Sequence, residues 1–252
     1  MIDFNTLKKQ NWQNMTYDQR VDFYQKLENA MAASQNRKAR IVTPVYMTGE
    51  DKDIAGYYDG GDPSKIAINK RMIMEDYRRY DNCDTIIHEG RHAFQDDCIV
   101  GKAYIGNIED VNKISDWHKN FYQYHEPDKT NNNVKYRFQP VEKDAYEYAN
   151  KEFDKLTENV KDRDLYDYKH ARDIENNNIK LKAEQIYGKN YEEKIKNEIN
   201  SSYEKKYGNS YKKDQGFDFL ADRESRNSNN QTNTNDQDMG QFMGFGQSNG
   251  LS

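Results

Sequence analysis

Hydrophobic and polar positions repeat with a helical period in several parts of the chain. In residues 17–31 the apolar positions recur every three or four residues and share one face of a helix, and Thr16 with Gln19 matches the capping box that begins such a helix. The pattern predicts two further helices, one from a cap at Asn82 or Asp84 to about Asp97, and one over residues 111–124. We therefore expect a largely helical protein.

Two short segments between these helices have the composition of β-strands. "IVTPVYM", from Ile41, is rich in β-branched residues, although Pro44 restricts it to an edge strand or a broken one because proline cannot donate a backbone hydrogen bond. "KIAIN" places Ile66 and Ile68 on one face of a second strand, and "GYYDGGDPS" between the two segments is dense in turn-forming residues. We expect a hairpin or small sheet here, and hence an α+β fold.

The chain beyond residue 155 is charged and dotted with tyrosine. Tyrosine or isoleucine recurs every fourth residue from Tyr187 to Tyr207, a step that drifts around a helix and so differs from a coiled-coil heptad. This pattern favours a partly docked or solvent-bridging helical extension. From Ser225 the sequence is dominated by Asn, Gln, Ser, Thr and Gly, which bury too little apolar surface to offset the entropy of ordering. We predict a compact domain over residues 1–155, a charged helical extension over 156–224 and a disordered tail over 225–252.

Composition narrows the classes of function. The 252 residues include 38 Lys and Arg against 43 Asp and Glu, and this mild acidity argues against general nucleic-acid binding, which usually needs a basic face. No apolar stretch approaches the length of a membrane span, and the N-terminal residues lack the pattern of a secretory signal. Cys83 and Cys98 lie too far apart on one helix to form a disulfide, and free thiols fit a reducing compartment. We expect a cytoplasmic protein without nucleic-acid or membrane partners, with leaderless export left open.

The segment "TIIHEGRHAFQ", Thr85 to Gln95, carries the clearest chemical signal. His88 and His92 lie four residues apart, so on a helix both imidazoles can face one point, with Glu89 beside them. In this His-Glu-x-x-His arrangement the imidazoles bind Zn²⁺ and the glutamate accepts a proton from water. The apolar residues on both sides of the motif suit a helix buried beside a core. The alternative is a pair of surface histidines that fall four residues apart by chance.

A catalytic zinc site uses three protein ligands, and the third must come from another segment. Glu142 is our choice, because Pro140 can open a helix in whose first turn Glu142 lies, and the helix dipole favours a carboxylate there. Glu142 would otherwise only cap its own helix. The alternative third ligands are Glu147 on the same segment, and His118 and His125, which would complete an all-histidine site.

With these residues the sequence resembles the zincin superfamily, specifically its glutamate-ligand branch, the gluzincins. The resemblance covers about residues 41–150, with "KIAIN" as a strand, "TIIHEGRHAFQ" as the metal helix and "QPVEKDAYEYA" as the ligand helix. Small metallopeptidase-like domains of bacterial, phage, mobile-element and polymorphic-toxin proteins share this order. The resemblance implies a small sheet over a pair of helices, with Zn²⁺ between them and substrate antiparallel to an edge strand. It also implies His88, His92 and Glu142 as ligands and Glu89 as general base.

We therefore expect a zinc-dependent metallopeptidase that acts on a peptide or protein substrate. Such an enzyme needs a donor for the oxyanion of its tetrahedral intermediate. Tyr136 is our candidate for this catalytic role, and Arg137 and His125, also close to Glu142 in sequence, are alternatives. The competing hypothesis is a catalytically silent zincin-like scaffold, an interaction or assembly protein of a phage or mobile element, which binds a protein partner through its C-terminal helical extension and tail. An exported toxin would use the same chemistry in another compartment.

Overall fold

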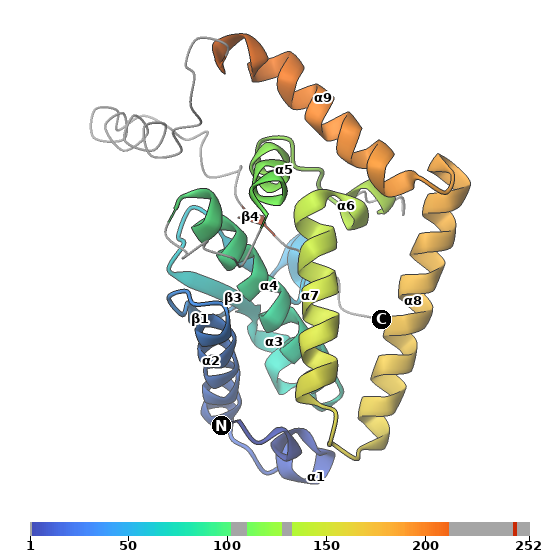
Figure 1. Cartoon of the computed structure of the whole chain (residues 1–252). Helices are drawn as coiled ribbons and strands as arrows, with labels where there is room; N and C mark the ends of the chain where they lie inside the picture. Colours follow the sequence, from blue (N-terminus) through green and yellow to red (C-terminus); the bar gives the residue numbers. More distant parts are fainter. Residues whose placement is uncertain (1, 102–109, 128–132, 212–243, 246–252) are drawn as a thin grey trace, which may run out of the picture.

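The fold was obtained as a computed structural model, which describes residues 2–101, 110–127, 133–211 and 244–245. Most of these residues are helical, and a small sheet lies on one side of the helices (Figure 1). The expected α+β fold class is confirmed. The tail predicted to be disordered lies outside the described residues, except for Gly244–Phe245.

The sheet contains β1 (Ile41–Val45), β3 (Lys65–Asn69) and β2 (Gly56–Asp59) in that order, with the two-residue β4 (Gly244–Phe245) beside β2. β1 and β3 are parallel, whereas β2 is antiparallel to β3 and to β4. Pro44 therefore lies on an edge strand of the described sheet, as predicted. The assignment of "GYYD" to a turn is wrong, because these residues form β2. Tyr58 is fully buried there, so packing against the core overrides the local turn signal.

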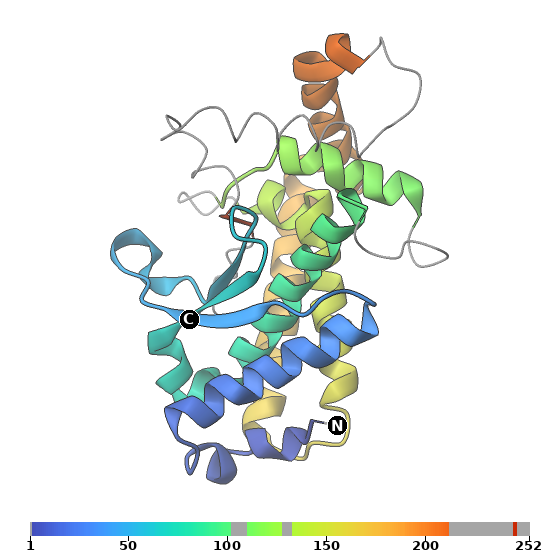
Figure 2. The ribbon, with the colours of Figure 1, turned by 90° about the vertical axis from the view of Figure 1, so that its left-hand side faces the viewer.

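Helix α4 (Arg79–Ile99) is the central element. It packs against β2 and β3 on one side, against α2 (Tyr17–Ser34) on another and against α7 (Pro140–Leu156) on a third, as the turned view in Figure 2 makes visible. None of its 21 residues is exposed. Gly56 of β2 allows the close approach to α4, because a Cβ at this position would lie 2.8 Å from Cγ2 of Thr85.

The N-terminus of α4 differs from the prediction. Arg78 is the N-cap residue, so the helix begins before both predicted caps. Asn82 is buried and donates a hydrogen bond to the carbonyl of Met72, whereas Asp84 accepts one from the hydroxyl of Tyr168. Both polar side chains form hydrogen bonds with other segments of the chain. Such partners cannot be predicted from the residues next to Asn82 and Asp84 in the sequence.

The other helix termini follow the sequence more closely. Thr16 and Gln19 form both hydrogen bonds of the capping box at the start of α2, and Pro140 occupies the first turn of α7. The remaining helices are α1 (Lys9–Trp12), α3 (Lys70–Met74), α5 (Val111–Tyr122), α6 (Val134–Phe138), α8 (Arg163–Tyr187) and α9 (Tyr191–Tyr211), and three short 3-10 turns lie at Phe4–Leu7, Gly49–Asp53 and Asp76–Arg78.

The main core fills the space between α2, the sheet and α4. Its fully buried members include Leu7, Trp12, Tyr24, Leu27, Ile66, Ile68, Ile86 and Ile87. A separate cluster holds α9 on α6, because Tyr191, Ile195 and Ile199 of α9 pack on Val134 and Phe138 of α6. The tyrosine and isoleucine repeat therefore docks α9, while α8 leaves Tyr166, Ile174 and Leu181 exposed.

Two features of composition can be followed in the structure. Every helix in the described ranges is too short or too polar to cross a lipid bilayer. Cys83 and Cys98, both on α4, are buried and form no disulfide with each other, as their spacing predicts.

Candidate metal centre

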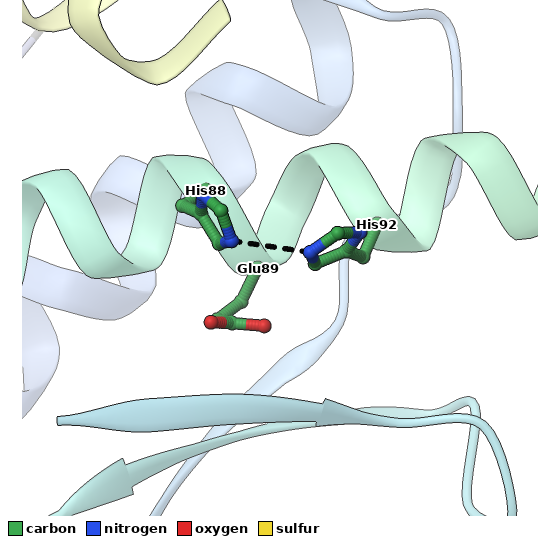
Figure 3. Close-up of side chains that lie close together, drawn as sticks. All are labelled: His88, Glu89 and His92. Atoms are coloured by element: carbon green, nitrogen blue, oxygen red, sulfur yellow. Dashed lines mark hydrogen bonds between the residues drawn. The ribbon is translucent and has the colours of Figure 1, made fainter. Parts of the chain in front are cut away.

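Helix α4 brings His88 and His92 together on one face, one turn apart. Their Nε2 atoms lie 3.1 Å from each other, and both side chains are buried. The carboxylate of Glu89 extends from the same helix, below and between the two imidazoles and on the side of the strands (Figure 3). These three buried residues form a group whose donor atoms are close enough together to hold a metal ion.

Glu142, in the first turn of α7, adds a carboxylate to the two imidazoles. Its Oε1 lies 3.2 Å from Nε2 of His92, and its Oε2 lies 3.3 Å from Nε2 of His88. Ligand atoms at about 2.0–2.1 Å from a tetrahedral zinc ion are about 3.3–3.4 Å apart. The two imidazole nitrogens, and each nitrogen with one of the two oxygens of Glu142, therefore lie nearly as far apart as neighbouring zinc ligands, and this residue set fits the metal.

The protonation states also suit a metal. Burial lowers the pKa of His88 to about 4, so its imidazole is neutral at pH 7. Burial alone would raise the pKa of Glu142, but the neighbouring imidazoles of His92 and His88 outweigh it and hold this pKa well below its ordinary value. A neutral imidazole and an ionised carboxylate are the forms in which these side chains bind metal.

Glu89 is fully buried, and its two oxygens have different surroundings. Oε2 accepts a hydrogen bond of 2.8 Å from the backbone N–H of Tyr58 in β2, whereas Oε1 has no hydrogen-bond partner in the described part of the chain. Burial and then repulsion from Glu142 raise the pKa of Glu89 well above its ordinary value. A carboxylate with raised proton affinity, held at one oxygen and free at the other, is suited to act as a general base.

A side-chain network orients His92. Its Nδ1 lies 2.9 Å from Oε1 of Gln95, whose Nε2 donates to the carbonyl of Val141 and to Oδ2 of Asp144. Because both amide hydrogens of Gln95 are used, its oxygen accepts and Nδ1 of His92 must carry the hydrogen. Nε2 is then left with the lone pair that a metal requires. Asp144 is in turn held by Arg91 at 2.7 Å.

Three tyrosines complete the surroundings. The hydroxyl of Tyr124 donates to Oε1 of Glu142 at 2.7 Å, and the ring of Tyr146 packs on the ring of His88 at 4.3 Å between centroids. Tyr136, the predicted oxyanion donor, is buried on α6 and lines a cavity together with His88, and burial raises its pKa well above the ordinary value. Its phenol is therefore protonated at neutral pH, as a donor must be. Its catalytic role stays a prediction.

The alternative ligands considered from the sequence lie elsewhere. Glu147 is largely exposed and pairs with Lys143 on the surface of α7. His118 is buried on α5 among aromatic rings, and the backbone N–H of His125 donates to the side chain of Gln139. Of the surrounding residues that sequence reasoning missed, Gln95 alone has a local signal, because it follows His92 by three residues on the same helix.

No protein-family model, no curated protein and no solved structure matches this chain. The arrangement of side chains is therefore the basis for assigning a function.

Proposed function

We propose that the protein is a zinc-dependent metallopeptidase of the gluzincin type, with His88, His92 and Glu142 as ligands and Glu89 as general base. One observation carries the proposal: the two imidazole nitrogens lie 3.1 Å apart, each lies 3.2 or 3.3 Å from one oxygen of Glu142, and beside them is a buried carboxyl group with one oxygen unbonded. When bound, zinc lowers the pKa of its water ligand to about 7, which makes hydroxide available for attack on an amide at neutral pH.

Each nearby group then has a defined task. Oε1 of Glu89 accepts the proton of the attacking water, while the N–H of Tyr58 fixes Oε2 and so keeps Oε1 turned toward the site. Glu89 afterwards passes that proton to the nitrogen of the leaving amine. The hydroxyl of Tyr136 donates to the carbonyl oxygen as negative charge develops on it.

The donor set alone does not select the metal, because two histidines and one carboxylate also bind iron(II) in oxygenases. The adjacent carboxyl group favours hydrolysis, since a general base has a task there in activating water. Substrate class follows from the same reasoning: a zinc site with such a base hydrolyses amides in the family that the sequence resembles.

Metal analysis and hydrolysis of a random peptide library test the proposal together. Wild type and Glu89→Gln are expected to retain about one zinc per chain, whereas His88→Ala and Glu142→Ala lose it. Glu89→Gln should also reduce hydrolysis by about 10²–10⁴-fold. Glu147→Gln, an exposed glutamate on the same helix as Glu142, is the matched control and should retain both zinc and activity. Full zinc occupancy without cleavage of any peptide would contradict the proposal.

The scaffold hypothesis has one observation in its favour, the exposed apolar residues of α8, which could contact a partner. It predicts zinc uptake without hydrolysis, and partner binding that is lost when the C-terminal part is removed. A cut at residue 155 would not test this, because Leu165 of α8 belongs to the main core and Tyr168 packs on Phe153. Replacement of the exposed Tyr166, Ile174 and Leu181 by serine in the full chain tests it instead, because a truncation after Tyr211 would keep α8.

A further inference from the structure

A polar cavity of about 120 Å³ lies next to the metal centre, on the side of His88. It is lined by residues of α4, α6, α7 and α8, including His88, Tyr136, Arg137, Tyr146, Glu175 and Asn176. A space of this size holds several water molecules or a small polar group such as a carboxylate. The metallopeptidase mechanism above assigns no role to most of these side chains.

Arg137 is the distinctive group in this cavity. Its Nη2 donates to Oδ1 of Asn176 at 2.7 Å, and its guanidinium carbon lies 3.2 Å from the ring centroid of Tyr146. No carboxylate forms an ion pair with Arg137 among the described residues. Arginine keeps its proton in proteins, so the cavity contains a fixed positive charge without a counter-charge in contact. Burial lowers the pKa of Arg137, although the charges of Glu142 and Glu175 act in the opposite direction.

The other charged groups of the cavity are largely engaged with partners. Asp81 pairs with Arg78 at 3.0 Å, Asp84 accepts from the hydroxyl of Tyr168 at 2.7 Å, and Arg172 pairs with Asp154 at 2.9 Å. Glu175 makes no ion pair with Arg137 in the described structure, although it precedes Asn176 on α8. Arg172 has two buried nitrogens, Nε and Nη1, without a hydrogen bond, but its charge is balanced by Asp154. Arg137 is the arginine of this lining that has no ion pair among the described residues.

The position of Arg137 connects it to the metal centre. The ring of Tyr146 contacts both the guanidinium of Arg137 and the ring of His88, with 4.3 Å between the two ring centroids. An anion bound by Arg137 would thus lie one aromatic ring away from a candidate metal ligand. This is close enough for both groups to bind one substrate molecule.

We propose that this cavity is a subsite for a carboxylate of the substrate, with Arg137 as the residue that binds it. The inference rests on the proposed function, because it treats His88 as part of the reaction centre. The planar guanidinium presents pairs of N–H donors that match the two oxygens of a carboxylate. The substrate would be a peptide with an acidic side chain, or a free C-terminus, close to the bond that is cut. Asn176, which holds Arg137, gives α8 a part in substrate selection.

Peptide binding to the full chain carrying Glu89→Gln tests the subsite without relying on cleavage. Four fluorescein-labelled peptides share the scaffold Gly-Ala-Ala-Phe-Xaa-Ala-Ala, in which Xaa is glutamate or glutamine and the C-terminus is a free carboxylate or an amide. Fluorescence anisotropy should give at least about tenfold tighter binding for a peptide with the recognised carboxylate than for its neutral counterpart, since hydrogen bonds between charged groups are the strong ones. The two pairs distinguish a side-chain carboxylate from a terminal one.

Variants assign the effect to Arg137. Arg137→Met should abolish the preference for the carboxylate, Arg137→Lys should retain part of it, and Arg163→Met, which removes an exposed arginine from α8, should leave it unchanged. Thermal unfolding identifies a variant that fails to fold. In that case Glu175→Gln, which keeps Arg137 and removes a nearby negative charge, should strengthen carboxylate binding by about two- to fivefold.

The outcomes separate the subsite from the peptidase. Equal binding of all four peptides, binding of none at millimolar concentration, or a preference that survives Arg137→Met overturns the subsite. Hydrolysis by the wild type without a carboxylate preference would leave the proposed function standing and remove this inference. A carboxylate preference that depends on Arg137, without hydrolysis by any chain, would support the subsite and overturn the peptidase.

Discussion

Two clusters of buried charge lie against the same part of α4, around Gly90 and around His88, and they differ in how completely their polar atoms are bonded. In one, both oxygens of Glu28 accept from Arg37 at 2.6 and 2.8 Å, and the backbone N–H of Arg40 also donates to this carboxylate. In the other, the metal centre, Oε1 of Glu89, Oε2 of Glu142 and Nδ1 of His88 have no hydrogen bond among the described residues.

This difference separates a structural role from a functional one. A buried charge with a full set of partners needs nothing further and serves the fold. A buried group of donors with unused atoms has capacity for a ligand that the polypeptide does not supply. Glu28 and Arg37 therefore stabilise the fold, whereas Glu89 and Glu142, which are buried as well, keep the unused oxygens on which the proposed function depends.

The largest expected effect comes from breaking the bonded cluster. Arg37→Met leaves the charge of Glu28 buried without its partner, which should lower the free energy of unfolding by about 3–5 kcal/mol. Denaturant titration measures this loss. Asp22→Asn removes half of the exposed pair with Lys26 and should change stability by less than about 1 kcal/mol. A similar decrease in the free energy of unfolding in the two variants would mean that burial does not make the Glu28–Arg37 pair more important for stability than the exposed Asp22–Lys26 pair.

Gly90→Ala tests how tightly the bonded cluster packs against α4. A Cβ at this position would lie 2.7 Å from Nη2 of Arg37 and 2.9 Å from Oε2 of Glu28, both held in place. We expect a loss of about 2–3 kcal/mol in thermal or denaturant unfolding. Gly208→Ala in α9 is the control, because its Cβ would meet only the flexible, exposed side chain of Glu204, and the helix should gain stability. Equal responses would contradict the packing argument.

The metal centre should make the metal-free protein sensitive to acid. His88 has a pKa of about 4 in the folded chain but its ordinary value of about 6.5 when unfolded, so between these values the unfolded chain binds more protons. The contribution of His88 to stability should therefore rise with pH over this window and fall by about 2 kcal/mol from pH 7 to pH 5, whereas carboxyl groups with raised pKa values, such as Glu89, contribute in the opposite direction. Unfolding measured in chelator should lose this part of the slope in His88→Gln. His170→Gln, at an exposed histidine, should retain the slope.

The smallest effect is expected from the residue that orients His92. Gln95→Leu removes the acceptor for Nδ1–H of His92, and the affinity for zinc should fall by about tenfold or somewhat more. Competition with a chelator of known affinity measures this change, with Gln10→Leu at an exposed position as the control. Unchanged zinc affinity would mean that the network only packs α4 against α7.

Local patterns predicted the parts of the centre that one helix provides. The four-residue spacing of His88 and His92 needs only the geometry of a helix, and Pro140 marks the start of α7 wherever that helix lies. The same holds for the capping box of α2, which depends on two residues three positions apart. Such features are encoded within one turn, so the sequence alone reveals them.

Features that depend on distant partners were missed. The strand "GYYD" forms because Tyr58 is buried against the core and its N–H is bonded to Glu89, 31 residues away. Asp84 is bonded to Tyr168 on α8, so it does not cap its helix. The cavity beside His88 likewise needs α8 as a wall. Secondary-structure propensity does not predict these contacts, because they depend on tertiary packing and not on neighbouring residues in the sequence.

Helix α4 packs against other elements on every side, and this limits which of its residues can be substituted during evolution. Substitutions are tolerated best at exposed positions, and no residue of α4 is exposed. A lineage that carries this chain can alter α4 only together with matching changes in β2, α2 or α7. The exposed face of α8 lacks this constraint, and we expect its residues to vary more among homologues than those of α4.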